Sequence, residues 1–153
     1  MEETGVVPGG TIDIVRGCLV VAISSNLYEQ SAFMIQRDVL KKIEETGVKG
    51  VVINMAGVDM LDSTLANIIF DTARTTPMLG ATTVIVGFKP GVVASIIDLD
   101  VKFGDIRTAL TLEDGLNTLE PIVSSQGPFE ENEDEEETPQ EEINAGDDYD
   151  DEM

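Results

Sequence analysis

The chain of 153 residues contains no histidine and no tryptophan, and its single cysteine is Cys18. The absence of histidine removes the usual general base, the Ser-His-Asp and Cys-His arrangements, and the commonest metal ligand. A single cysteine excludes an internal disulfide and a cysteine metal cluster. Cys18 opens an apolar run, which predicts a buried small side chain rather than a reactive thiol. We therefore expect no enzymatic activity, no cofactor and no bound metal.

Positive charge is also scarce, since 9 Lys and Arg stand against 30 Asp and Glu, for a net charge of −21. Without a basic patch to contact phosphates, the chain is not expected to bind nucleic acid. No apolar run approaches the ~18 residues of a membrane helix, and the first residues form no apolar signal segment. The expectation is a soluble protein of the reducing cytoplasm that does not bind membranes.

The negative charge is concentrated in the last thirty residues. Residues 1–123 hold 16 Asp and Glu and all 9 Lys and Arg, a net of −7, whereas residues 124–153 hold 14 Asp and Glu and no base, a net of −14. Such a segment buries too little apolar surface to offset the entropy cost of ordering. The composition predicts a folded domain over 1–123 and a disordered acidic tail over 124–153. The tail is either a solubilising extension or a competitor for a basic face of a partner.

Strands and helices are predicted to alternate through the first 123 residues. Apolar and β-branched runs predict strands, and apolar residues at helical spacing predict helices that end at Gly or begin at Pro. The predicted strands are 11–15, 18–24, 50–55, 82–87 and 105–108, and the predicted helices are 28–46, 63–79, 89–99 and 111–120. The short connections favour parallel pairing with right-handed crossovers. The fold class is α/β, with a small, mainly parallel sheet of four to five strands and about four helices.

The first candidate site is the loop that joins the strand at 50–55 to the helix beginning at Ser63. Ser63 stands where backbone N–H groups point outward and favour negative charge. Either Asp62 or Ser63 can cap this helix. Met60 and Leu61 are apolar residues in a loop, which indicates a partner surface or a hydrophobic staple onto the helix. Both a serine that receives a phosphate and an ordinary helix start fit this pattern.

Two other segments carry charge without a recognisable binding motif. The glycine-rich turn at 87–92 places Lys89 at a helix start, but it lacks the spacing of a phosphate-binding loop. We interpret it as a strand-to-helix turn with an exposed lysine. The acidic tail lacks the pattern of an EF-hand calcium loop, so a solvated segment is the simpler interpretation.

Three stretches of the chain resemble STAS domains, the fold of sulfate transporters and anti-sigma-factor antagonists. They are VVINM (51–55) followed by VDMLDS (58–63), MLGA (78–81) followed by VIVGFKP (84–90), and IDLDV (97–101). The resemblance covers roughly residues 8–121. Within the family the chain is most similar to the RsbS-type stressosome scaffolds. Such a scaffold is expected to be a single domain, without the N-terminal sensor domain of RsbR-type relatives.

The resemblance implies a phosphorylated serine. The family's phosphorylated Ser or Thr follows the Asp at the start of the second helix, which matches Ser63 after Asp62. The unphosphorylated chain is then expected to sequester a partner serine kinase of the RsbT type and to release it on phosphorylation. Ser95 matches a second phosphorylation site of RsbR-type relatives and is a secondary candidate. The partner-binding residues expected around Ser63 are Asp59, Met60, Leu61, Asp62 and Thr64.

The implied partners are RsbR-type STAS paralogues and an RsbT-like serine kinase, in a large homo- or hetero-oligomeric assembly that regulates a stress response. A phosphate adds about −1.5 to −2 charge beside Asp59 and Asp62, which is enough to disturb a fitted partner surface. Two other functions remain open. One is a free anti-sigma-factor antagonist that binds an anti-sigma kinase in solution, and the other is a STAS module that binds a small ligand.

Overall fold

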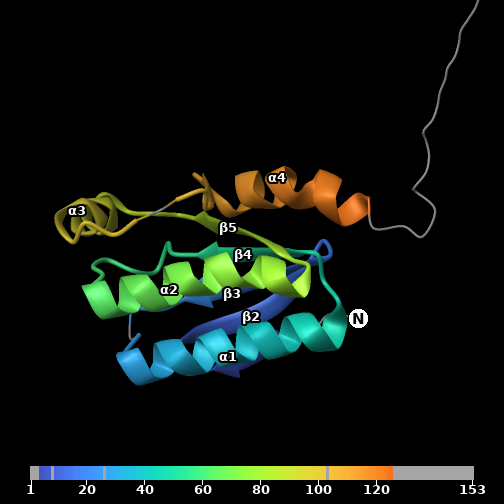
Figure 1. Cartoon of the computed structure of the whole chain (residues 1–153), viewed down its shortest axis with the longest axis horizontal. Coiled ribbons are helices and arrows are strands. Elements are labelled where there is room, and N and C mark those ends of the chain that lie inside the picture. Colours follow the sequence, from blue (N-terminus) through green and yellow to red (C-terminus); the bar gives the residue numbers. More distant parts are fainter. Residues whose placement is uncertain (1–3, 8, 26, 103, 126–153) are drawn as a thin grey trace, which may run out of the picture. The chain divides into compact units, whose positions relative to one another are not determined.

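The structure is a computed structural model that describes residues 4–7, 9–25, 27–102 and 104–125 (Figure 1). Six strands of this described part form one sheet in the order β1-β2-β3-β4-β5-β6. The strands are β1 (Thr4–Val7), β2 (Gly10–Val15), β3 (Cys18–Ile23), β4 (Gly50–Asn54), β5 (Thr82–Val86) and β6 (Arg107–Ala109). The helices are α1 (Glu29–Thr46), α2 (Ser63–Thr75), the short 3-10 helix η1 (Thr76–Leu79), α3 (Pro90–Asp98) and α4 (Leu112–Ser124).

The sheet combines an antiparallel part with a parallel part. β1, β2 and β3 pair antiparallel, whereas β3, β4, β5 and β6 pair in parallel. The turn between β2 and β3 has φ of 52° at Arg16 and 79° at Gly17, and positive φ at both central residues is what a tight hairpin turn requires. The predicted α/β fold with a mainly parallel sheet is confirmed. The sequence does not predict β1, because its four residues are too few to show an alternating pattern.

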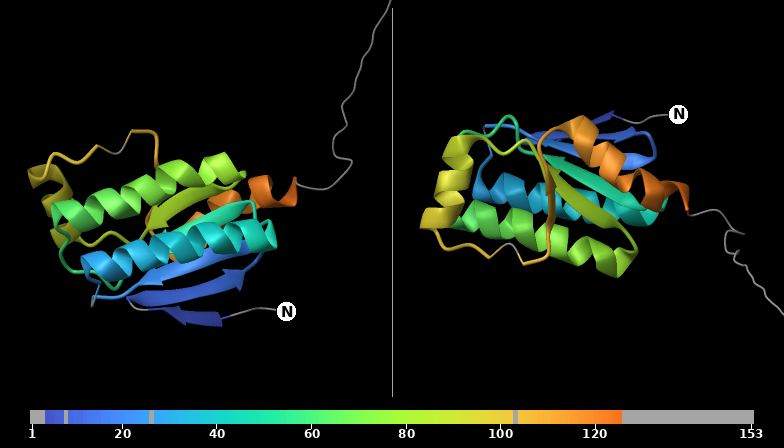
Figure 2. Two further views of the ribbon diagram at one scale, coloured as in Figure 1. Left: turned by 60° about the horizontal axis from the view of Figure 1, so that its bottom comes forward. Right: turned by 90° about the horizontal axis from the view of Figure 1, so that it is seen from above.

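Helices cover both faces of the sheet (Figures 1 and 2). α1 and α2 lie side by side on one face and α4 lies on the other, while α3 follows the carboxyl end of β5. Successive side chains of β4 point to opposite faces of the sheet. Val51 and Ile53 belong to the core under α1 and α2, and Val52 belongs to the core under α4. Because β4 is buried on both faces, its sequence is a continuous apolar run.

The helix boundaries depart from the predicted ones where proline or packing intervenes. The predicted helix over 63–79 is α2 followed by η1, since Pro77 has no N–H to continue the α-helical pattern. α4 continues to Ser124, four residues past its predicted end, because Ile122 and Val123 pack partly buried against the core on its face of the sheet. β6 begins at Arg107, where pairing with β5 begins, rather than at residue 105.

Cys18 is 1% exposed, as predicted for a small apolar side chain. Burial raises the pKa of its thiol, and the Arg16 guanidinium lowers it by a smaller amount, so the inert thiol form is favoured. Within the described residues, no helix has both the length and the apolar character that crossing a membrane requires. The predicted acidic tail lies, apart from Ser124 and Ser125, outside the described residues.

Candidate functional site

The candidate site lies in the loop that leaves the carboxyl end of β4. Asn54, the last residue of β4, accepts a hydrogen bond from the Ala56 N–H at its side-chain Oδ1 (3.0 Å). The Val58 N–H then donates to Met55 O (3.0 Å), which turns the chain towards α2. These local bonds give the loop a defined path before it reaches the helix.

Asp62, and not Ser63, caps α2. The Asp62 backbone is extended (φ −90°, ψ 173°), and its Oδ1 accepts a hydrogen bond from the Leu65 N–H (2.8 Å). Ser63 is therefore the first helical residue, and its side chain is exposed, as is that of Thr64. The described part of the chain provides no hydrogen-bond partner for the Ser63 hydroxyl. Asp62 thus stabilises the helix start while Ser63 stays accessible to a modifying enzyme.

The two apolar residues of this loop have opposite environments. Met60 is 78% exposed, whereas Leu61 is only 5% exposed and belongs to the core under α1 and α2. This burial favours the second interpretation of Leu61, a hydrophobic staple onto the helix, over the predicted contact with a partner. Leu61 precedes the cap residue and Ala66 is the fourth helical residue, the two positions of a hydrophobic staple, and both are buried in that core. The core anchors the loop through Leu61 and leaves Met60 in solvent.

A second loop, between β5 and α3, contacts the first. Lys89 Nζ lies 2.8 Å from Asp59 Oδ1 and forms an ion pair with it. Gly91 lies so close to the Asp59 carbonyl oxygen that a Cβ there would approach it to 2.9 Å. Gly87 has a φ of 79°, and a Cβ at this position would lie only 2.8 Å from Asn54 Oδ1. The two loops therefore pack closely against each other.

The sequence does not predict this ion pair, since the turn at 87–92 by itself indicates only an exposed lysine. The ion pair follows from the register of the sheet. Asn54 pairs with Val86, so the loops that follow β4 and β5 leave the sheet side by side. The carboxyl ends of neighbouring parallel strands are where α/β proteins gather their sites.

Ser95, the secondary candidate, lies on α3 and is less accessible than Ser63. Its side chain is partly buried, and its hydroxyl donates a hydrogen bond to Gly91 O (2.9 Å). A kinase would have to break this bond before it could transfer a phosphate. Ser63 has no such obstacle among the described residues.

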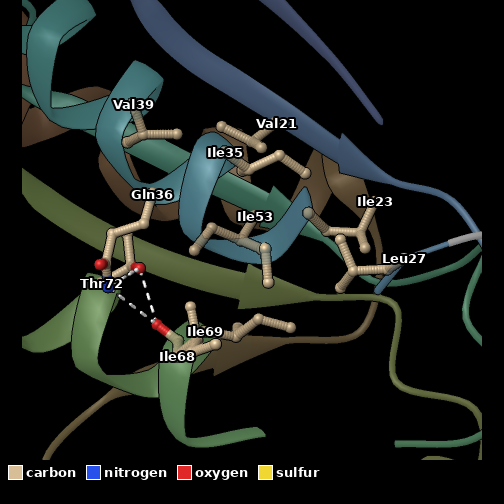
Figure 3. A pocket seen from close by; sticks show the side chains of 11 residues that line it. Val21, Ile23, Leu27, Ile35, Gln36, Val39, Ile53, Ile68, Ile69 and Thr72 are labelled. Atoms are coloured by element: carbon tan, nitrogen blue, oxygen red, sulfur yellow. Dashed lines mark hydrogen bonds between the residues drawn. The ribbon is translucent and has the colours of Figure 1, made fainter. Parts of the chain in front are cut away.

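The structure also bears on the possibility of a small-ligand site. A cavity of about 20 Å³ lies between α1, α2 and the sheet, lined by apolar side chains together with Gln36 and Thr72 (Figure 3). Across it the Gln36 side-chain amide donates to Thr72 Oγ1 (2.9 Å) and to Ile68 O (3.3 Å). Such a volume accommodates about one water molecule. This cavity therefore does not support binding of a small organic ligand.

A larger open groove of about 510 Å³ lies beside β6 and is lined in part by Arg74, Asp105 and Arg107. Arg74 is already engaged, since it pairs with Asp71 Oδ1 (2.8 Å) and donates to Lys102 O. With Arg74 paired to Asp71 and one further carboxylate, Asp105, beside Arg107 in the lining, the charges in and around the groove balance, so it has no excess of cations to select an anion. In the described residues, no cluster of three His, Cys, Asp or Glu is placed to hold a metal ion.

The chain matches the family model described as "STAS domain" over residues 11–115. One curated relative is the "RsbT co-antagonist protein RsbRA" of Bacillus subtilis (strain 168), which is 22% identical over 107 residues. The match covers 70% of this chain but only 39% of that protein, so the chain spans well under half of the length of this relative.

Two solved structures are similar to the chain over almost their whole length. A serine-to-glutamate variant of RsbS from Moorella thermoacetica is 28% identical, with a TM-score of 0.66, and the match covers 77% of this chain and 97% of that one. A chain from a structure on the molecular architecture of the stressosome, "a signal integration and transduction hub", is 29% identical, with a TM-score of 0.64. That match covers 72% of this chain and 96% of the other.

Proposed function

Because this chain belongs to the STAS-domain family, we propose that it is a non-catalytic antagonist and stressosome scaffold. In its unphosphorylated form it sequesters a partner serine kinase of the RsbT type, and phosphorylation of Ser63 releases that kinase. The observation that carries the proposal is the exposed Ser63 hydroxyl, which lies unbonded among the described residues beside the Asp62 cap and follows the exposed Met60. The protein acts in the cytoplasm, together with its kinase.

The relatives support this function and these partners. The two similar structures are an RsbS protein and a chain of a stressosome, and each is covered almost entirely by the match. The curated relative from Bacillus subtilis is an RsbT co-antagonist protein. We infer that RsbR-type STAS paralogues are the assembly partners of this chain and that an RsbT-like kinase binds the assembly.

The partner surface is expected to consist of side chains that solvent reaches. Asp59, Met60 and Thr64 are exposed around Ser63, and the exposed Asp62 carboxylate also holds the helix cap. Leu61 is left out because it is buried. A phosphate on Ser63 brings about −1.5 to −2 charge next to two carboxylates and beside the exposed Met60. A partner fitted to the unmodified surface then loses complementarity without unfolding of the domain.

The first prediction concerns the charge on Ser63. Ser63→Asp is expected to weaken kinase binding by about 5- to 150-fold, the usual range of coupling between a switch and a binding site, whereas Ser63→Ala retains binding. An acidic residue in the first turn of α2 is favourable for the helix, so the variant is expected to fold. Titration calorimetry with the purified RsbT-like kinase measures the three affinities.

Thr118→Glu is the matched control, since it adds one negative charge at an exposed position of α4, on the opposite face of the sheet. It is expected to bind the kinase as the natural chain does. Equal affinity of the natural chain, Ser63→Ala and Ser63→Asp would contradict the proposal. Mass-spectrometric mapping of phosphosites before and after stress then tests whether cells modify Ser63 rather than Ser95.

A further inference from the structure

Lys89 and Asp59 form the ion pair that joins the two loops of the candidate site, with 2.8 Å between Nζ and Oδ1. We propose that Lys89 is the counter-ion of phosphorylated Ser63 and that phosphorylation transfers Lys89 from Asp59 to the phosphate. This inference rests on the proposed phosphorylation of Ser63 and adds a second residue, Lys89, which binds the phosphate. The carboxylate of Asp59 is freed by the same event.

The first argument is the local charge. Lys89 is the single Lys or Arg in the segments 54–66 and 86–93, which make up the two loops and the helix starts that follow them. Asp59 and Asp62 are the acidic residues of the same segments. The Asp62 carboxylate accepts the Leu65 N–H and stays with the helix. A phosphate on Ser63 therefore competes with Asp59 for this lysine.

The second argument is that a phosphate attracts Lys89 more strongly than the Asp59 carboxylate does, and that the exposed side chains can exchange partners at little cost. A phosphate dianion carries up to twice the charge of a carboxylate and attracts an ammonium group more strongly at equal distance. The side chains of Lys89 and Asp59 are 46% and 72% exposed, so exchanging partners removes little water from either group. The lysine ammonium sits on a flexible four-carbon stem and accepts partners from several directions.

The third argument is that the loops stay together during the exchange. A Cβ built on Gly91 at the start of α3 would lie 2.9 Å from the Asp59 carbonyl oxygen, and one built on Gly87 would lie 2.8 Å from Asn54 Oδ1 and 3.0 Å from Ala56 N. This close approach of the two loops does not involve the side chains of Lys89 and Asp59, so it does not depend on the ion pair. Ser63 follows Asp59 by four residues and is exposed at the start of α2. The lysine is thus held beside the segment that receives the phosphate.

The exchange has a consequence for partner binding. In the unmodified chain Asp59 is neutralised by Lys89 next to the exposed Met60. After the exchange the Asp59 carboxylate is unpaired on the surface that is proposed to face the kinase. The partner then meets a rearranged pattern of charge across the whole loop, rather than one added group at Ser63.

The test uses the full chain with phosphoserine incorporated at position 63 during translation, and it follows the phosphorus NMR signal against pH. A nearby ammonium stabilises the phosphate dianion, so Lys89→Met is expected to raise the midpoint of the second ionisation by roughly 0.2–0.7 pH units, the size expected for an exposed ion pair. Lys41→Met, an exposed lysine of α1, removes the same charge elsewhere and is expected to leave the midpoint unchanged. The difference should shrink in about 0.5 M salt.

A midpoint that is the same with Lys89 and with Met at position 89 would overturn the inference. A second readout is the backbone amide spectrum of Asp59 and Met60. Phosphorylation and the Asp59→Asn substitution both remove the ion pair, so they are expected to shift the Met60 amide in the same direction. Because the phosphoserine is installed during translation, these results do not depend on a cellular kinase. A cell experiment that finds no phosphate on Ser63 would contradict the proposed function. An unchanged titration midpoint would contradict only the role of Lys89, so the two failures can be told apart.

Discussion

Gly87 and Gly91 determine how closely the loops after β4 and β5 approach each other. Gly91 has an ordinary backbone conformation but faces the Asp59 carbonyl oxygen, whereas Gly87 combines a φ of 79° with contact to Asn54 and Ala56. Any side chain at these positions would push the β5–α3 loop away from the site. The distance between Lys89 and Asp59 thus depends on two glycines, which have no functional group in a side chain.

The prediction at the residue scale compares two glycines with similar positive φ angles. Gly47→Ala, with φ of 71° and no atom within 4 Å of the new Cβ, is expected to cost only the left-handed conformation, about 1–2 kcal/mol. Gly87→Ala meets Asn54 Oδ1 at 2.8 Å as well, and is expected to cost about 1–3 kcal/mol more. Urea unfolding of both variants measures the difference. Equal losses would show that the loops do not pack as described.

Met60 and Leu61 show what residue identity leaves open. Both are large apolar residues of one loop, and the sequence allows either to face a partner or the core. In the structure Leu61 is 5% exposed and Met60 is 78% exposed. Leu61 stands directly before the Asp62 cap, the position from which an apolar side chain packs back onto the helix, whereas Met60 stands one residue earlier. The pairing of Lys89 with Asp59 depends on two strands that are adjacent in the sheet but not in the sequence.

At the scale of elements, a buried pair of threonines ties the end of α2 to β5. Thr76 Oγ1 and Thr83 Oγ1 are 2.6 Å apart, and the two residues are 0% and 5% exposed. Thr76 also donates towards Ala73 O (3.2 Å). Since buried hydroxyls are costly without partners, this pair helps to determine where α2 gives way to η1. It also holds β5 in place, and β5 carries the Lys89 loop.

The element-scale prediction is a double-mutant cycle on this pair. Thr76→Val leaves the Thr83 hydroxyl without a partner among the described residues and is expected to cost about 1–3 kcal/mol. Thr83→Val leaves Ala73 O as an acceptor for Thr76 and is expected to cost less. The double variant should lose less stability than the sum of the single variants, since both hydroxyls are gone. Additive losses in urea unfolding would argue against a coupled pair.

At the scale of the whole molecule, charge is the dominant property. The chain has a net charge of −21, of which −14 lies in residues 124–153. Many copies gathered in one assembly repel one another through such charge unless salt screens it. We therefore propose that the acidic segment weakens assembly at low ionic strength. This role needs no defined structure in the segment.

The prediction at this scale is a sizing experiment with an RsbR-type STAS protein. The chain and this partner are expected to form a particle much larger than either protein alone, as measured by light scattering after size exclusion. A free anti-sigma-factor antagonist would form no such particle. A variant without residues 126–153 keeps all of α4 and is expected to assemble at lower salt than the full chain, with the two converging near about 0.5 M. Identical salt dependence would remove the proposed role of the segment.

Much of the fold is readable from local pattern. Apolar runs, helical periodicity and the positions of Gly and Pro predict the α/β class and most strands and helices, because each of these signals acts within a few residues. The hairpin at Arg16-Gly17 and the start of α2 at Ser63 are of this kind. Local pattern misses the edge strand β1 and the exact start of β6, because short edge strands are defined by what they pair with.

The sequence by itself determined the fold class of the protein, the lack of histidine and of a second cysteine, and the serine that follows Asp62 at a helix start. Only the tertiary structure decided that Asp62 is the cap, that Leu61 is buried while Met60 is exposed, and that Lys89 pairs with Asp59. The physical reason is the separation along the chain of the residues that interact. Composition and periodicity act along the chain, whereas burial and ion pairing depend on parallel strands that bring distant loops together.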